Sequence, residues 1–446
     1  MALAQGSSEL IWWPYLVAKY GLGLLFLLAP ACLLQYPLNY QIGFYTLATG
    51  EGIFQGFIRL NRFFALFLWA LMAISFFWFG AFASAGGTAL AALTHFPHNW
   101  SEKGQTLFWA YGSIGLFFSA IVFSKVIYAL IEKVMYAVAF LTLFGLLWAA
   151  AHPDVLRVLP AFLKGLCFPQ WPVDRPWESK DATELLTAIT FAGLGGFWTL
   201  FYSYWLREKG AGMGRFMGHM TGMLGKKEEI SESGFVVGED IASQKAIRPW
   251  RRFLLLDIAI GIFGNLFTTL LMCLLAYALL FPKKILPQGY ELAVVQSRFF
   301  EIRLGGLGRL LFLIVAAAFL CDTWLATVDA VSRIHTEVLR SLFPRLRRLS
   351  SRSGYYFFLV ILTAITSLTM AFQPPGPLIL LSAVIGFIGT VIFSFALLFL
   401  NHKVLARELP PFARLGRWAF GLMSLTCAAY LILAGTYLYL RFHGHS

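Results

Sequence analysis

The sequence LLTAITFAGLGGFWTLFYSYW, residues 185–205, is an apolar run interrupted near its centre by Gly193, Gly195 and Gly196. About 20 apolar residues are enough for one membrane-spanning helix, whereas closely spaced glycines weaken a helix. Unwound backbone within a membrane is stable only where it is buried in protein or lines a polar cavity. The run therefore predicts a discontinuous membrane helix whose free carbonyl and amide groups face a binding site.

A similar break is predicted near the start of the chain, where Gly6, Ser7 and Ser8 stand directly before an apolar run. Glycine is also ordinary packing material in membrane helices, so either break alone has a structural explanation. Paired breaks at equivalent places in two halves of a chain are typical of transporters whose substrate binds near the bilayer midplane. Because the two breaks match in position, we expect them to form one site.

The composition agrees with a polytopic membrane protein. Hydrophobic residues make up 59% of the 446 positions and charged residues only 13%, about half the charged fraction of an ordinary soluble domain. The apolar runs do not alternate residue by residue, as the strands of a membrane barrel do. They predict an all-α protein with segments at about residues 9–19, 22–46, 62–93, 105–124, 127–150, 183–206, 252–281, 305–339, 354–373, 377–400 and 416–440.

The proline-rich joint 151–182 is predicted to be an external linker between two halves of the chain. Residues 1–150 would form a first five-helix repeat and residues 183–404 a second. The second repeat includes a cytoplasmic loop at 207–252, and residues 405–446 hold an eleventh helix and the C-terminal tail. Because five is odd, the two repeats start on opposite sides of the membrane, which predicts an inverted repeat.

The net charge of +13 comes from Lys and Arg residues that gather in alternate joints, above all in residues 207–252. By the positive-inside rule, these joints are cytoplasmic. We therefore expect a multi-pass protein of the plasma (inner) membrane with a cytoplasmic N-terminus and an external C-terminus. Since topology accounts for the basic residues, we expect the lipid bilayer as a partner and no nucleic acid.

Sequence patterns of catalysis and of tightly bound metal are absent. There is no Ser-His-Asp order, no HExxH motif and no pair of carboxylates on one short loop. The five cysteines have no CxxC spacing, so neither a disulfide framework nor a zinc site is indicated. We expect no enzymatic activity and no bound cofactor.

Glu9 is the first acidic residue that requires a functional explanation, since an acid at the bilayer centre is unfavourable by roughly 2.5 to 3.5 kcal/mol on insertion scales. It lies about ten residues, or roughly 15 Å, from Lys19 at the external end of its helix. That depth is close to the midplane. Eight residues precede Glu9, about 12 Å even as a helix, so we expect the first broken helix to be truncated.

A second group of acids lies in the segment at 305–339. Asp322 and Asp329 are seven residues apart and share one helix face with Thr323 close by. A polar stripe in an apolar run predicts a face turned to a water-filled path or to partner helices. For Asp329 the alternative is a structural ion pair with Arg333, its i,i+4 neighbour. Asp322 lies deeper and is the stronger candidate.

Two further acids are predicted to be structural. Asp257 lies a turn past Arg252, and Glu132 is beside Lys133. Both are expected to form ion pairs at the membrane surface, and we leave both out of the expected site.

Residues 6–64 resemble the first three helices of the Nramp family of divalent metal transporters. In that family an Asp-Pro-Gly-Asn break is followed by a Tyr-Gly turn, which corresponds here to residues 20–21. The second helix ends in a Thr-Gly motif, here residues 49–50. The resemblance implies a LeuT-like fold of two inverted five-helix repeats plus an eleventh helix, and alternating access without nucleotide hydrolysis.

The resemblance also implies where the substrate would bind, and the sequence departs from the family there. At the family spacing, Gly6 takes the place of the metal-binding Asp and Glu9 that of the Asn. The family's Met-Pro-His falls near residues 196–198. A Met thioether favours softer transition metals, and its loss leaves a set of hard oxygen ligands that suits partly hydrated magnesium.

We therefore expect a secondary active transporter whose substrate is a divalent cation, Mg²⁺ or Mn²⁺-like, with a proton or sodium ion as the coupling ion. The alternatives are an amino-acid or other organic solute symporter on the same fold, and a non-transporting membrane sensor. Glu9 is the expected principal ligand, since a carboxylate compensates the charge of the cation. The other expected ligands are Gly6, Ser7, Ser8, Gly195, Gly196 and Thr199, with Asp322, Asp329 and Thr323 as proton carriers or supporting groups.

Overall fold

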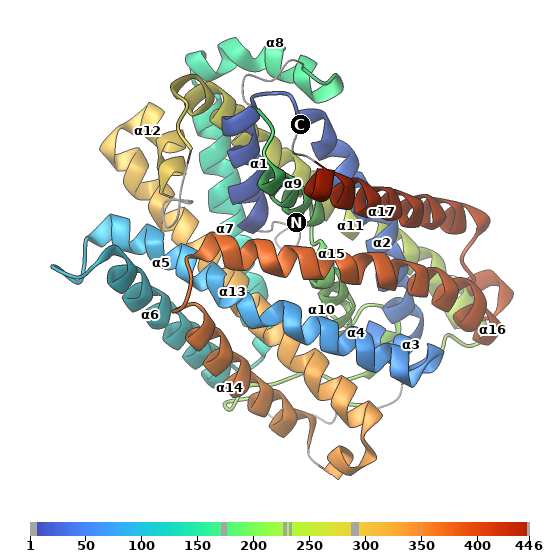
Figure 1. Cartoon of the computed structure of the whole chain (residues 1–446). Helices are drawn as coiled ribbons and strands as arrows, with labels where there is room; N and C mark the ends of the chain where they lie inside the picture. Colours follow the sequence, from blue (N-terminus) through green and yellow to red (C-terminus); the bar gives the residue numbers. More distant parts are fainter. Residues whose placement is uncertain are drawn as a thin grey trace.

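The computed structural model describes most of the chain as one helical bundle (Figure 1). Every regular element within the described ranges is helical. The described residues are 7–170, 176–225, 230–231, 234–286, 294–348 and 350–443, with the backbone alone for residues 7–10 and 344.

Each apolar run predicted from the sequence contains one or two helices in the described part of the chain. A helix satisfies its backbone groups internally, which is what an apolar run needs within lipid. By length and composition, seven helical stretches of the described residues are able to cross a membrane. The helices of the apolar runs are α1 (Ser7–Tyr20), α2 (Leu28–Thr49), α4 (Arg62–Ser75), α5 (Gly80–Thr94), α6 (Glu102–Phe123), α7 (Ile127–Ala150), α9 (Ser179–Thr190), α10 (Phe201–Glu208), α11 (Ile241–Leu279), α13 (Gly306–Leu342), α14 (Ser351–Thr369), α15 (Pro375–Phe399) and α17 (Arg417–His443).

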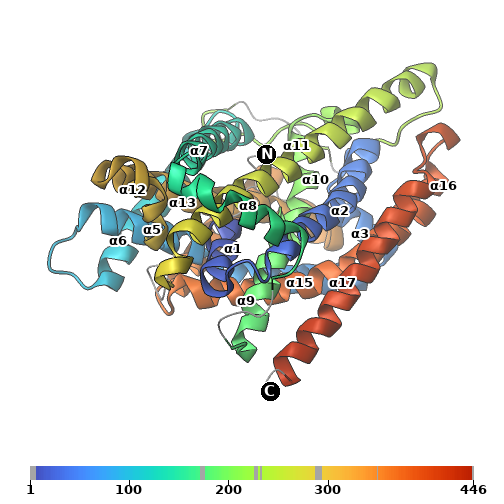
Figure 2. The same cartoon turned by 90° about the horizontal axis from the view of Figure 1, so that it is seen from above.

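Four further helices were not expected from the sequence. Within the predicted linker, α8 crosses one end of the bundle above α11 (Figures 1 and 2). It buries Val155 and Phe162 against the bundle and leaves Leu156 and Leu163 about half exposed, so it covers the bundle with one face only. The four are α3 (Ile53–Leu60), α8 (Pro153–Cys167), α12 (Arg298–Leu304) and α16 (Leu405–Glu408).

Helix α11 begins at Ile241, well within the loop predicted at 207–252. Asp240 caps the helix by accepting a hydrogen bond of 2.8 Å from the backbone N–H of Ser243. The amide and hydroxyl of Ser243, which both donate to this carboxylate, lower its pKa below the ordinary value. The first turns of α11 are polar, which is why hydrophobicity placed the start of the helix too late.

Helix α5 packs closely against α13 on one side and against α6 on the other (Figure 1). Helix α5 carries Gly86 and Gly87 side by side. A Cβ atom on Gly86 would overlap the sulfur of Cys321 on α13, and one on Gly87 would overlap the backbone of Thr106 on α6. These small residues allow the helices to approach closely, as is common in membrane proteins.

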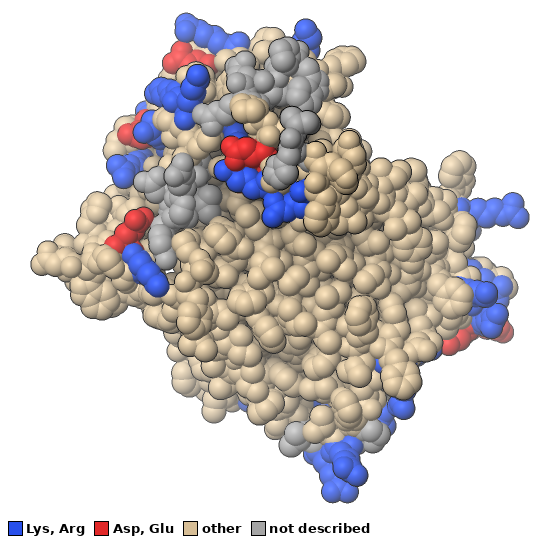
Figure 3. Space-filling model, viewed as in Figure 1, with Lys and Arg blue, Asp and Glu red and all other residues tan. Residues whose placement is uncertain are grey.

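Charged side chains lie at the rims of the molecule, and a broad uncharged band separates them (Figure 3). Many apolar side chains are exposed, among them Phe140 on α7, Phe357 on α14 and Ile432 on α17. A belt of this kind matches the hydrocarbon core of a bilayer, which is about 30 Å thick. The protein is a multi-pass membrane protein.

Candidate functional site

The discontinuous helix predicted at residues 185–205 is present. Helix α9 ends at Thr190, residues 191–195 are not helical, and a 3₁₀ turn, Gly196–Leu200, leads into α10. Gly193, Gly195 and Gly196 have φ angles of +100°, +50° and +55°. Residues other than glycine rarely adopt this backbone conformation. At Gly195 a Cβ atom would also overlap the carbonyl oxygen of Thr190. The break therefore depends on these glycines.

Helix α1 lies beside α9 (Figure 1). Near the middle of the bundle, α1 begins and α9 ends. A buried polar cluster joins the opposite ends of the two helices, where α1 ends and α9 begins. Lys19 and Tyr20 of α1 both donate hydrogen bonds to the carboxylate of Asp181, and the ammonium of Lys19 lies 3.8 Å from Glu184. This cluster holds the two short helices together, so the unwound segment 191–195 lies near the start of α1.

The residues predicted for the first break are described only in part. Gly6 lies outside the described residues. Ser7, Ser8 and Glu9 belong to the first turns of α1, but the description there extends to the backbone alone. Their expected role as ligands stays a prediction.

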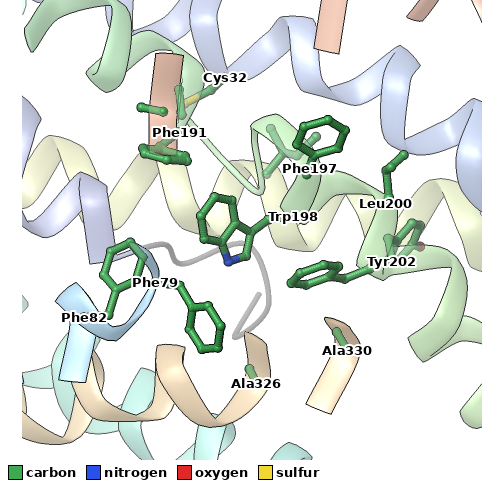
Figure 4. Packing of buried hydrophobic residues seen from close by; sticks show 14 of the residues in the cluster. Cys32, Phe79, Phe82, Phe191, Phe197, Trp198, Leu200, Tyr202, Ala326 and Ala330 are labelled. Carbon is green, nitrogen blue, oxygen red and sulfur yellow. The ribbon is translucent and has the colours of Figure 1, made fainter. Parts of the chain in front are cut away.

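An aromatic cluster backs the break on the side of α13. Trp198 lies at its centre, with Phe191 of the unwound segment and Phe82 of α5 around it (Figure 4). The ring of Phe76 meets the Trp198 ring edge-on at 4.6 Å between centroids. The indole N–H of Trp198 donates a hydrogen bond of 3.0 Å to the Thr327 hydroxyl of α13. This cluster was not predicted from the sequence. Aromatic residues are frequent throughout the chain, and their spacing does not indicate which of them contact each other in the folded protein.

Two hydroxyl groups at the break are buried without a hydrogen-bond partner in the described chain. They belong to Thr190, at the end of α9, and to Thr199, which was predicted as a ligand. A buried hydroxyl that lacks a partner is unfavourable by about 1–3 kcal/mol. Thr199 therefore has a free oxygen at the break.

Gly196, which was also predicted as a ligand, lies against Gly386 of α15. A Cβ atom on Gly196 would be 3.4 Å from the Gly386 Cα.

Asp322 is buried and makes no hydrogen bond or ion pair with the described residues. It lies one turn from Ala326, and Ala326 faces the Trp198 cluster in Figure 4. Because residues four apart share a helix face, Asp322 is on the face of α13 that fronts the break. Thr323 beside it donates to the backbone carbonyl of Phe319 over 3.1 Å, so its hydroxyl is bonded within its own helix.

Asp329 is in the ion pair that the sequence offered as its structural explanation. The Nε of Arg333 lies 3.0 and 2.9 Å from the two carboxylate oxygens of Asp329, and the Tyr355 hydroxyl of α14 donates to one of them over 2.7 Å. Arg333 also pairs with Glu208 of α10. These three buried charges link α13 to α10. The partner Glu208 was not predicted, because it lies far from Arg333 in the sequence.

Glu132 and Asp257 are ion-paired, but not with the neighbours expected for them. Both carboxylates lie near the ammonium of Lys209, at 3.8 and 3.9 Å. Lys209 follows α10 directly, whereas Glu132 lies on α7 and Asp257 on α11. The expectation of pairs with Lys133 and Arg252 was wrong because it considered only residues close in sequence.

No group of three or more His, Cys, Asp or Glu side chains converges as a ready metal site among the described residues.

The sequence matches no family model and no curated protein, but the structure resembles solved transporters. A mutant of the Eremococcus coleocola manganese transporter aligns with a TM-score of 0.63 and 15% sequence identity, over 100% of this chain and 89% of that one. The same transporter in complex with an aromatic bis-isothiourea compound aligns with a TM-score of 0.63 and 14% identity, with the same coverage.

A second kind of transporter is also similar. MhsT in complex with L-phenylalanine aligns with a TM-score of 0.55 and 14% identity, over 99% of this chain and 97% of that one. At these identities the likeness concerns the fold. The chain thus has the LeuT-like fold that these transporters share, and the resemblance to the Nramp family predicted from its sequence is confirmed at the level of the fold.

Proposed function

We propose that this protein is a secondary active transporter that moves a divalent cation, Mg²⁺ or Mn²⁺-like, by alternating access. The observation that carries the proposal is the unwound segment 191–195, held beside the start of α1 by the Lys19–Asp181 contact. Unwound backbone at the middle of a membrane protein supplies carbonyl oxygens to a cation. Glu9 in the first turns of α1 would add the carboxylate that compensates its charge.

The proposed ligand set combines this carboxylate with neutral oxygens. Ser7, Ser8 and the backbone of Gly6 would contribute from the first break, and Gly195 and Gly196 from the second. The Thr199 hydroxyl, which is buried without a partner, would complete the set. Mg²⁺ is commonly bound through one or two carboxylates while it keeps several waters, so a single Glu is sufficient.

The coupling ion is proposed to be a proton or a sodium ion. Asp322 is our candidate for the proton carrier, since it is a buried acid without an ion-pair partner on the face of α13 that fronts the break. Asp329 already forms an ion pair with Arg333, so we propose that its role is to stabilise α13. From the distribution of basic joints we place the protein in the plasma (inner) membrane with a cytoplasmic N-terminus.

The second candidate function is symport of an amino acid or another organic solute. The aromatic cluster around Trp198 favours it, because an apolar wall beside unwound backbone would bind a side chain and a carboxylate together. MhsT, which has a similar fold, binds L-phenylalanine. Glu9 argues against this candidate, since a buried carboxylate would repel the carboxylate of an amino acid.

Flux into proteoliposomes tests the proposal, with Mg²⁺ and Mn²⁺ measured separately and each used as competitor of the other. We expect saturable uptake that Glu9→Gln abolishes while the variant is still expressed and folded. Glu102→Gln is the matched control, because Glu102 is exposed at the start of α6. Normal uptake by Glu9→Gln would refute the ligand assignment. Uptake of L-phenylalanine without uptake of either metal would establish the second candidate.

A further inference from the structure

A cavity between α2, α7, α10 and α11 extends from the helix break toward the end of α10, and none of the proposed ligands of the transport site among the described residues lines it. It has a volume of about 80 Å³ and is partly open. Leu194 of the unwound segment lines it near the break, and Lys209 lines it beyond the end of α10. Its other polar lining includes Asn39, Glu132, Tyr202 and Asp257.

The charges in the cavity do not balance. Glu132 and Asp257 carry two negative charges, and Lys209 supplies one positive charge between them. Its ammonium lies 3.8 Å from the Glu132 Oε1 and 3.9 Å from the Asp257 Oδ1, which is too far for a good hydrogen bond. The Lys209 side chain is also 36% exposed. The ammonium is therefore held by two long ion-pair contacts and by the Phe253 ring, whose centroid is 5.7 Å away, rather than by short hydrogen bonds.

Tyrosine hydroxyls hold both carboxylates in place without neutralising them. Tyr128 and Tyr136 each donate to the Glu132 Oε1 over 3.2 Å, and Tyr202 donates to the Asp257 Oδ2 over 2.9 Å. An oriented carboxylate loses less conformational entropy when it binds an ion. The two acids thus stay in position if Lys209 leaves.

Asn39 gives an independent indication of a cation. Its side chain is 4% exposed, and its amide Nδ2 donates to the Gln35 backbone carbonyl over 2.8 Å. The Asn39 Oδ1 is buried without a hydrogen-bond partner in the described chain, although the residue lines the cavity. An amide oxygen that lacks a donor, in a cavity that two carboxylates also line, is suited to a cation or to the water around one.

We propose that this cavity is a second divalent-cation site, in which hydrated Mg²⁺ or Mn²⁺ displaces the Lys209 ammonium from Glu132 and Asp257. The two positive charges of the ion match the two carboxylates, which one ammonium leaves unbalanced. The carboxylate oxygens lie nearly 4 Å from the ammonium position, farther than the 2.0–2.1 Å of a direct Mg–O bond, so the ion retains waters between itself and the protein.

In this arrangement Lys209 is a tethered competitor of the cation, and its return to the carboxylates releases the ion. The inference rests on the proposed function, since it takes the transported cation as its ligand. It adds a site between the break and the end of α10, at which the cation is held after it leaves Glu9 or before it arrives there.

Binding of Mn²⁺ to the purified full-length protein in lipid nanodiscs tests the inference, with free Mn²⁺ followed by electron paramagnetic resonance. Glu9→Gln provides the background, because it removes the first site. We expect this variant to bind one Mn²⁺ ion that Mg²⁺ displaces. On that background Lys209→Met should lower the Kd at least about tenfold, because one unit charge about 4 Å away is removed.

Asp257→Asn on the same background should abolish this binding, whereas Asp154→Asn should not change it. Asp154 is the matched control, since it is an acid that pairs with a base, Arg157, over 3.1 Å at an exposed position on α8. Absence of Mn²⁺ binding in Glu9→Gln, or an unchanged Kd in Lys209→Met, would overturn the inference. Binding that persists in a protein without metal flux would retain the cavity site and refute the transport proposal.

Chemical labelling of the unmodified chain gives a test that needs no variant. If the cation displaces Lys209, an amine-reactive reagent should modify this side chain several times faster with Mn²⁺ than without it. Lys180, an exposed lysine paired with Glu178 over 2.6 Å, serves as the internal control. An equal labelling rate of Lys209 with and without Mn²⁺ would contradict the displacement.

Discussion

Replacement of Arg333 by methionine is expected to lower the free energy of unfolding by about 3–5 kcal/mol, the range observed when one partner of a buried ion pair is removed. The side chain of Arg333 is 1% exposed, and its Nε lies 2.9 Å from the Oδ2 of Asp329, which is fully buried. It also pairs with Glu208, whose side chain is 2% exposed. Without Arg333, both buried carboxylates lose the guanidinium that pairs with them. A pair of charges 4 Å apart at an effective dielectric constant of 20 interacts by about 4 kcal/mol, in agreement with that range.

Asp329→Asn should be milder, because Arg333 keeps Glu208 and the Tyr355 hydroxyl keeps an acceptor. Loss of hydrogen bonds to a charged group predicts about 1.5–3 kcal/mol. Combined with Arg333→Met, this substitution should recover part of the loss, since it removes one of the two unpaired acids.

The assay is reversible unfolding in mixed micelles of detergent and SDS, followed by tryptophan fluorescence. Flux per folded molecule is measured in parallel. Arg417→Met is the control, because Arg417 is exposed at the start of α17 and should change stability by less than about 0.5 kcal/mol. An unchanged unfolding free energy in Arg333→Met would refute the structural reading of this cluster. Full stability of Asp329→Asn together with loss of flux would instead assign Asp329 to transport.

Three further outcomes are expected. Gly195→Ala should destabilise the protein by at least about 1–3 kcal/mol, because the φ angle of Gly195 is +50° and the new Cβ would overlap the Thr190 carbonyl. Gly435→Ala is the control and should not destabilise it, since Gly435 has open space around it. Equal melting temperatures of the two variants would contradict this prediction. Asp322→Asn should keep or raise stability, since a buried acid without a partner is removed. Uptake by this variant should no longer depend on a coupling-ion gradient. Uptake that still follows the gradient would exclude Asp322 as the carrier. Asp181→Asn should lower stability by about 3–5 kcal/mol, as it removes the carboxylate that joins α1 to α9, and an unchanged unfolding curve would contradict that role.

The helices and the break between α9 and α10 could be predicted from the sequence because their causes are local. An apolar run in a membrane has to be helical, since only a helix satisfies the backbone groups within one segment. Gly193, Gly195 and Gly196 mark the break because φ angles above zero favour glycine wherever they occur. By contrast, α8 and the first turns of α11 were missed, because polar residues in these helices hide them from a search for apolar runs.

The partners of the charged residues were decided by the tertiary structure. Asp329 pairs with Arg333 one turn away, which the sequence could offer as an alternative because that contact lies within one helix. Glu132 and Asp257 instead meet Lys209, and Arg333 also meets Glu208. These contacts join helices that are far apart in sequence, so they follow from how the helices pack.

The sequence by itself determined that this chain is a helical membrane protein with an interrupted helix, because length, hydrophobicity and glycine act along the chain. Only the tertiary structure showed that Lys19 and Asp181 join α1 to α9, that Trp198 fills one side of the interruption, and that a cavity with an unbalanced pair of carboxylates lies beside it. The physical reason is that a membrane helix can satisfy its backbone alone, whereas a buried charge or aromatic ring requires a partner that packing has to bring to it.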